Sequence, residues 1–285
     1  MYLGWYPCKL KLFTSLIKFN NKEFFVNKVL VAVLSWNRQP FTKRFLETFF
    51  NGTKEPVDMV IVEQGSAEPA KKLCKSIDGK ITENGSTIKV IWNANNVGIP
   101  KGLNQAMSLK KPEQHFMKID NDVIIPSTYP DWLTHMVDII ENTTEKDNMK
   151  ILGLSPFSPK RPFSERFNLR PVTLKNGHIY NIEQVPHNLL EMGILIANSI
   201  VAKVGPFNNN GLMYGYEGVW YQSRATCSKA YFYTCEALHA DSLQLLESNT
   251  HQSLKAQMLK GVKEANVVLE KFSEDETLLN VKFKE

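Results

Sequence analysis

The sequence predicts an α/β fold with a mostly parallel central sheet and helices packed against it. Short runs of apolar, β-branched residues alternate with segments of helical spacing from Lys28 to about residue 120. Such runs are typical of parallel strands that helices cover on both faces, and the alternation implies right-handed βαβ units. In addition, 43% of the 285 residues are hydrophobic and 22% are charged, as in a globular chain with a large core.

The first two strand–helix pairs are expected within residues 29–77. The run "VLVAVLS" (29–35) predicts a buried strand, and "PFTKRFLETFF" (40–50) places its apolar residues on one helical face, with proline near the start. The run "VDMVIV" (57–62) predicts the second strand, and "EPAKKLCKSI" (68–77) the second helix.

Two more strands follow. "IKVIW" (88–92) predicts the third strand, a helix is expected through "GIPKGLNQAMSL" (98–109), and "HFMKI" (115–119) predicts the fourth strand. Ligands of such sheets bind beyond the carboxyl ends of the strands. We therefore expect the loops after residues 35, 62, 92 and 119 to converge on one crevice.

Beyond about residue 150 the alternation is less regular. A strand is expected from 151, before a loop rich in proline and arginine. Residues 191–205 are interpreted as a strand and a turn, 229–235 as a strand, and 251–272 as helical. No flexible linker separates the two halves, so we expect one compact unit.

Composition narrows the class of protein. The net charge is +5, and its basic residues are spread along the chain, which suits an enzyme with an anionic substrate better than a nucleic-acid binder. The four cysteines form no CxxC pair and lack zinc-finger spacing, which favours a reducing cytoplasm.

Membrane spanning is not expected, because no apolar stretch reaches the roughly 18–20 residues that a spanning helix needs. The lysine-containing stretch 8–25 has one apolar helical face. Two interpretations stay open: peripheral contact with an anionic membrane, and the more common packing against the chain's own domain.

Asp120 and Asp122 stand one residue apart where the fourth strand is expected to end. Two like charges so close repel each other unless a positive group lies between them. One interpretation is a solvated turn, and the other is a divalent cation that carries a phosphate. Mg²⁺ and Mn²⁺ prefer oxygen ligands, so carboxylates suit the second interpretation.

Four stretches resemble, in the same order, segments of glycosyltransferase family 2, whose fold is called GT-A. "VLVAVLSWNR" resembles the first strand with its T/S-x-N-R loop, and "VIVEQGS" the acidic segment after the second strand. "NNVGIPKGLNQAM" resembles the N-x-G-x-x-x-x-x-N segment, and "KIDNDVIIP" the DxD-type metal motif. Each motif is weak alone, but four in order form a strong signal.

The resemblance implies a metal-dependent, inverting transfer of a sugar from a nucleotide-diphospho sugar, with a UDP-sugar favoured, to a hydroxyl acceptor. Breaking the sugar–phosphate bond leaves negative charge on the diphosphate, which a bound Mn²⁺ or Mg²⁺ can neutralise. By the resemblance, the metal site comprises Asp120, Asp122 and His239. Asp122 is a direct ligand, Asp120 contacts the ribose or a metal-bound water, and His239 completes the site. The expected donor-binding residues are Ser35, Asn37, Arg38, Glu63, Asn96, Gly98, Lys101 and Asp120.

The segment 204–225 resembles the acceptor segment of the family. Glu217 matches its glutamate, whereas Gly218 stands where the family usually has aspartate. An inverting transfer needs a carboxylate to take the proton of the acceptor hydroxyl, so Glu217 is the predicted catalytic base. The departure at Gly218 keeps open a non-catalytic relative that binds nucleotide or carbohydrate.

The resemblance also divides the chain. We expect an N-terminal extension (1–27), a nucleotide-sugar-binding half (28–145), an acceptor-binding and catalytic half (146–245) and a helical tail (246–285). A nucleotidyltransferase or a dinucleotide-dependent dehydrogenase is disfavoured, because no glycine-rich loop follows the first strand. The expected acceptor is a surface glycan or a lipid-linked saccharide. Modified viral DNA, in an infected host's cytoplasm, stays open.

Overall fold

The computed structural model describes residues 27–125, 131–156, 170–184, 192–208, 221, 224–225, 232–235, 239–242 and 279–284. The expected N-terminal extension lies outside the described residues, apart from Asn27. The predicted helix at 251–272 and most of the loop rich in proline and arginine also lie outside them.

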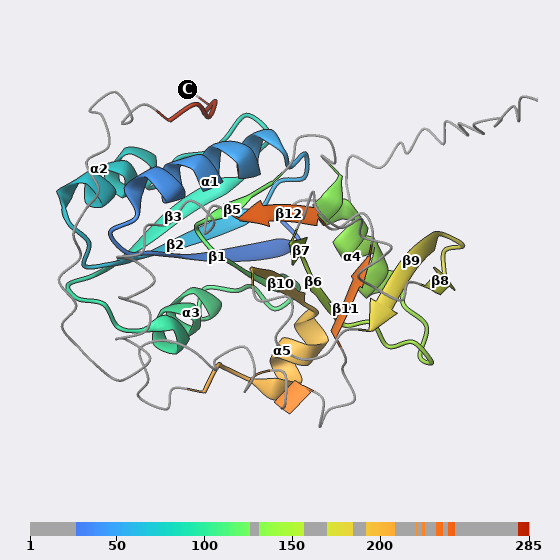
Figure 1. The fold of residues 1–285 in the computed structure, drawn as a ribbon. Helices are drawn as coiled ribbons and strands as arrows, with labels where there is room; N and C mark the ends of the chain where they lie inside the picture. Colours follow the sequence, from blue (N-terminus) through green and yellow to red (C-terminus); the bar gives the residue numbers. More distant parts are fainter. Residues whose placement is uncertain are drawn as a thin grey trace, which may run out of the picture.

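A nine-stranded mixed sheet runs through both halves of the chain (Figure 1). Its first four strands are parallel, and their positions agree closely with those predicted. In spatial order the strands are β3 (Thr87–Asn93), β2 (Asp58–Gln64), β1 (Val29–Ser35), β4 (His115–Ile119), β10 (Gly193–Ile196), β6 (Ile151–Gly153), β11 (Phe232–Cys235), β9 (Ile179–Gln184) and β8 (Arg170–Thr173).

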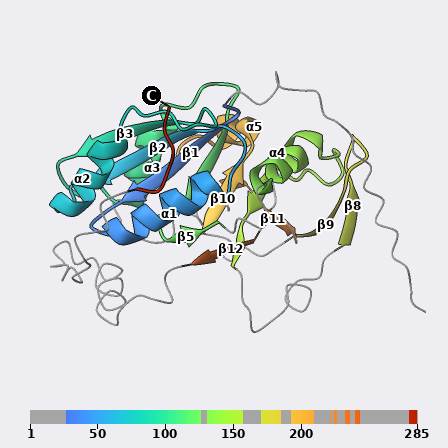
Figure 2. The same ribbon diagram turned by 90° about the horizontal axis from the view of Figure 1, so that it is seen from above.

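Helices cover both faces of the parallel part. α1 (Gln39–Asn51) and α2 (Glu68–Ile77) lie on one face, and α3 (Ile99–Met107) and α5 (Asn198–Val204) on the other (Figures 1 and 2). Helices α1, α2 and α3 each carry proline near the start, where the missing N–H costs no helical hydrogen bond. Because each follows a parallel strand, all three begin at the carboxyl edge of the sheet.

Beyond β4 the structure departs from the prediction in three places. Residues 191–205 contain the expected strand, β10, but the predicted turn is the helix α5. Its Ile200 and Val201 have modest helix propensity, yet both are buried, so packing decides the conformation. The helix α4 (Trp132–Asn142) and the β8–β9 hairpin had not been predicted.

A small second sheet joins distant parts of the chain. β12 (His239–Ser242) pairs with β5 (Val123–Ile124) on one side and with β7 (Ser155–Pro156) on the other. Ser242 lies opposite Val123 in this register. The backbone of 239–242 therefore runs beside the residues that directly follow Asp122.

Residues 279–284 pack against the first half of the chain. The backbone N–H of Asn280 donates to Glu47 of α1 at 2.9 Å, and Phe283 forms an antiparallel bridge with Thr82. Leu279, Val281 and Phe283 pack against the same hydrophobic core that the sheet and its helices share. Across the residues described, no helix is both long and apolar enough to cross a membrane.

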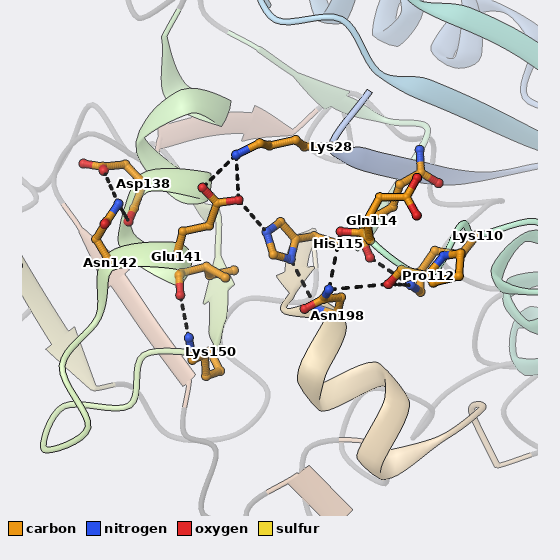
Figure 3. A network of polar contacts seen from close by, with 12 residues as sticks. Lys28, Lys110, Pro112, Gln114, His115, Asp138, Glu141, Asn142, Lys150 and Asn198 are labelled. Carbon is orange, nitrogen blue, oxygen red and sulfur yellow. Dashed lines mark hydrogen bonds and ion pairs between the residues drawn. The ribbon is translucent and has the colours of Figure 1, made fainter. Parts of the chain in front are cut away.

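Charged networks close the amino edge of the sheet, the edge at which the parallel strands begin (Figure 3). Lys28, just before β1, donates to both carboxylate oxygens of Glu141 in α4, at 2.8 and 2.9 Å. His115 faces the same carboxylate at 3.6 Å and accepts the N–H of Asn198, at the start of α5, on its other ring nitrogen. The pKa of Glu141 falls to about 2, chiefly through the contact with His115; burial opposes this shift and Lys28 adds to it.

Asp58, at the start of β2, is the centre of a second network at this edge. Asn27 and Thr87 donate to one of its carboxylate oxygens, and Lys111 and Gln114 to the other. Burial raises the pKa of Asp58, but the hydrogen bonds outweigh burial and the pKa lies below its ordinary value. Each oxygen of this carboxylate thus has two donors.

Candidate functional site

The four loops at the carboxyl edge of the sheet are bonded to one another, as the sequence predicts. Asn37, in the loop after β1, receives the N–H of Ala67 on its side-chain oxygen at 2.6 Å, and its own N–H donates to Ser66. Gln64, at the end of β2, accepts the N–H of Val97 in the loop after β3 at 3.1 Å. These bonds fix the first three loops as one unit.

Close backbone contact also holds the second loop against the third. Gly65 has φ +68, and a Cβ there would lie 2.5 Å from the carbonyl oxygen of Ala94 and 2.7 Å from Asn95 Cα. Only glycine combines this conformation with this approach. The glycine of the "EQGS" segment therefore allows the second and third loops to pack against each other.

Asp122, in the fourth loop, is the most unusual carboxylate of the site. It is 1% exposed, and its Oδ2 accepts a hydrogen bond from Arg38 Nη1 at 3.1 Å. Its Oδ1 is buried and has no hydrogen-bond partner, a state found in no other carboxylate among the described residues. A buried carboxylate oxygen without a partner is costly, which indicates a site built for a positive ligand.

Helix α1 supports this fourth loop along its length. Thr42 is buried and accepts a hydrogen bond from Asn121 at 2.9 Å, and Thr48 accepts the N–H of Ile125 at 3.3 Å. The guanidinium of Arg38 also lies over the ring of Phe41, 4.5 Å from its centroid. The contact with Arg38 and the supporting threonines could not be located from spacing alone.

Asp120 has a cation of its own. Lys118 in β4 lies 2.7 Å from Asp120 Oδ1, and the Lys118 side chain is only 11% exposed. The N–H of Asp120 donates to the carbonyl of Met192 at 2.8 Å, which extends β4 by one residue beside β10. Sequence reasoning missed Lys118, although a lysine inside the apolar run "HFMKI" signals that a partner is needed.

Ser35 and Glu63, both predicted to bind the donor, have buried side chains. The hydroxyl of Ser35 lies 3.4 Å from that of Thr42 and faces α1. Glu63 is 0% exposed, and its carboxylate accepts the N–H groups of Gly65 and Ser66 at 3.1 and 2.6 Å. Both side chains hold loops in place, and a contact of Glu63 with a base or ribose stays a prediction.

The third loop carries three of the predicted donor-binding residues. Asn96 accepts the N–H of Gly98, which has φ +84, and this turn leads into α3. Lys101 lies on the first turn of α3 and is exposed. Its side chain is therefore accessible to an anion at this edge.

Asn104 was not predicted as a site residue, yet it links the two halves. Its amide donates to the carbonyl of Phe207 and accepts the N–H of Phe207, both at 2.8 Å. Phe207 lies just before the segment 209–220, where Glu217 is located in the sequence. The last asparagine of the N-x-G-x-x-x-x-x-N segment thus fixes the start of the predicted acceptor segment.

Glu217 lies outside the described residues, so its role as the base stays a prediction. For His239 the backbone alone is described, and it pairs with Ser155 next to the strand that follows Asp122. His239, the predicted ligand, therefore lies on a strand that pairs with the strand directly after Asp122, and the position of its side chain is not described.

Comparison with known proteins agrees with this geometry. Residues 30–149 match the family model described as Glycosyl transferase family 2. This part of the chain is similar to a family 2 glycosyltransferase domain. That domain spans β1 to α4, with all four bonded loops. Curated protein sequences give no match.

Solved structures of glycosyltransferases share the GT-A fold of this chain. A mannosyltransferase from Pyrobaculum calidifontis, in complex with GDP-Man and Mn²⁺, matches with a TM-score of 0.59 at 12% identity, over 85% of this chain and 66% of that one. S. aureus TarS matches with a TM-score of 0.51 at 16% identity, over 81% of this chain and 42% of that one. At these identities the likeness shows the fold.

The residues present fit a divalent cation bound together with a diphosphate. Asp122 has a buried carboxylate oxygen without a hydrogen-bond partner, and Asp120, two residues earlier, directly follows strand β4. Within the described part of the chain, no group of three or more His, Cys, Asp or Glu residues could hold a metal ion. A cation here would therefore take its further ligands from a diphosphate, from water or from the undescribed part of the chain.

Proposed function

We propose that this protein is a metal-dependent, inverting glycosyltransferase that uses a nucleotide-diphospho sugar and a hydroxyl acceptor. The observation that carries the proposal is Asp122. It is a buried carboxylate at the carboxyl edge of a parallel sheet, with one oxygen held by Arg38 and the other without a partner. The family 2 match over 30–149 supports the same conclusion.

The bonded loops provide a rigid donor site. Arg38 and Lys101 supply positive charge, and α1, α2 and α3 begin at this edge without a side-chain hydrogen bond at the cap. Helix N-termini carry partial positive charge and free N–H groups, which favour phosphate. When Mn²⁺ or Mg²⁺ is bound, it supplies the charge that neutralises the leaving diphosphate.

Asp122 would hold that cation, with Asp120 beside it and His239 as a further ligand. Glu217 would take the proton of the acceptor hydroxyl as its oxygen attacks the anomeric carbon. Asn104 supports this role, because its two bonds to Phe207 fix the chain just before the segment that contains Glu217. The proposed acceptor is a surface or lipid-linked glycan, with modified DNA as the alternative.

Calorimetric titration of UDP and GDP, with and without Mn²⁺, tests the donor site. We expect Mn²⁺ to strengthen binding of one nucleotide at least tenfold, and Asp122→Ala to abolish that gain while the fold persists. The matched control is Asp131→Ala, which removes an exposed carboxylate that pairs with Lys54. Unchanged Mn²⁺-dependent affinity in Asp122→Ala would refute the proposed metal site.

A hydrolysis screen of sugar nucleotides, followed by glycan and DNA acceptor arrays, then tests transfer. Glu217→Gln should keep donor and metal binding while transfer falls about 10²–10⁴-fold. A wild-type protein that binds nucleotide but neither hydrolyses nor transfers sugar would instead support the non-catalytic relative that Gly218 suggests.

A further inference from the structure

We propose that Lys118 is a positioning residue that keeps the donor site electrically neutral, so that the divalent cation binds tightly only together with the nucleoside diphosphate. The inference rests on the proposed donor site. Its starting point is a lysine inside the apolar strand β4, with its ammonium 2.7 Å from Asp120 Oδ1.

Lys118 is almost fully buried, which is unfavourable for its positive charge. The whole residue is 9% exposed, and its neighbours in the ladder are Ala32 on β1 and Ile194 on β10. Holding a charged ammonium in such surroundings is unfavourable unless an anion compensates it. Asp120 supplies that anion while it remains 35% exposed at the site.

The two aspartates of the motif are paired on different sides of the sheet. Phe116, two residues before Lys118, packs on Phe207 with a centroid separation of 6.1 Å, so alternation places Lys118 on the α5 side. Asp122 instead pairs with Arg38, at the start of α1 on the opposite face. Each carboxylate therefore has its own cationic partner: Lys118 pairs with Asp120 on the α5 side of the sheet, and Arg38 pairs with Asp122 on the α1 side.

Charge balance gives this arrangement a consequence. A divalent cation that arrives alone meets carboxylates whose charge is already compensated, so its affinity is reduced. A diphosphate brings the negative charge that the cation needs, and Lys118 adds to the attraction that the diphosphate feels. Removing the lysine should therefore shift the two affinities in opposite directions.

Lys118→Met tests this, because methionine retains the apolar stem without the charge. We expect Mn²⁺ alone to bind the variant about tenfold more tightly than it binds wild type. Electron paramagnetic resonance, which detects the free Mn²⁺ ion, measures this affinity. Metal-free UDP or GDP, whichever binds wild type, should bind about tenfold more weakly in calorimetry. A merely structural role would weaken both.

Two controls isolate the local charge. Lys111→Met removes a positive charge at the amino edge, where Lys111 pairs with Asp58, and both affinities should stay within about twofold of wild type. Lys118→Arg keeps the charge and should keep both wild-type affinities. If Lys118→Met fails to fold, Lys118→Met combined with Asp120→Asn is compared with Asp120→Asn alone, and the same opposite shifts are expected.

The outcomes separate this inference from the proposed function. Wild type that binds neither Mn²⁺ nor nucleotide would refute the donor site itself. Wild type that binds both, with Lys118→Met moving the two affinities in the same direction or leaving both unchanged, would overturn the role of Lys118 alone.

Discussion

The two edges of the parallel sheet use charged side chains in opposite ways. At the amino edge, Asp58 has two donors on each oxygen, and both oxygens of Glu141 are held by Lys28. At the carboxyl edge, Asp122 is more deeply buried than either, yet one of its oxygens has no partner. Carboxylates at the amino edge thus have partners on both oxygens, whereas Asp122 at the carboxyl edge has a partner on only one.

The difference lies in what each network joins. The amino edge links strand starts to α4 and α5, and all four carboxylate oxygens of Asp58 and Glu141 are engaged there, which adds stability. The carboxyl edge links four loops while it retains an acceptor for a cation. Satisfied carboxylates should therefore affect folding when replaced, and the unsatisfied one should affect ligand binding.

Asp58→Ala should give the largest loss of stability. It leaves the donors of Lys111, Gln114, Thr87 and Asn27 without their shared acceptor, so we expect a loss of about 2–4 kcal/mol in the free energy of unfolding. Urea unfolding measures this, and nucleotide binding should stay within about twofold of wild type. Impaired Mn²⁺-dependent binding in a folded Asp58→Ala protein would break the contrast between the edges.

Glu63→Gln sharpens the comparison, because Glu63 lies at the carboxyl edge but is fully satisfied. Its replacement turns one acceptor toward the N–H of Gly65 or Ser66 into a donor, which should lower unfolding stability by about 1–3 kcal/mol. Donor affinity should fall with it, since the second loop loses its anchor. Weaker donor binding at full stability would instead indicate direct contact with the base or ribose.

Glu141→Gln should have the smallest effect, and one that depends on pH. The pKa of Glu141 lies at about 2, below its ordinary 4.5, so its stabilisation is present above about pH 4.5 and is lost as pH falls toward 2. Solvent screening of a side chain that is 37% exposed limits the contribution to about 1 kcal/mol. Urea unfolding of wild type and variant between pH 2 and 6 should show a gap that closes on acidification. A difference in unfolding free energy that stays constant between pH 2 and 6 would contradict this role of the Glu141 charge.

Sequence patterns predicted the parallel half of the fold well because β1, β2 and β4 are buried along almost their whole length. β1 and β4 have the bounds expected from their apolar runs. The same reasoning failed in the second half, because α5 contains β-branched residues of modest helix propensity and its packing against β4 determines its conformation. The β8–β9 hairpin has exposed residues at most positions of β8, so no apolar alternation marked it.

The candidate site was predictable in its loops and unpredictable in its pairings. Motif order indicated that Asp120 and Asp122 belong to one edge with Arg38 and Glu63. Nothing in linear spacing reveals that Arg38 lies opposite Asp122, because that contact joins residues 84 positions apart. The buried state of Glu63 and the cross-link from Asn104 to Phe207 depend in the same way on how the loops pack.

The segment 279–284 has a consequence for the timing of synthesis. The backbone of Asn280 bonds to Glu47, a residue made 233 positions earlier. At a translation rate of about 5–20 residues per second, α1 would wait roughly 10–50 s for this contact. During that interval the surface of α1 that residues 279–284 later cover is open to solvent and to chaperones. The growing chain therefore passes through a stage in which its first half has its strands but lacks its final covering segment.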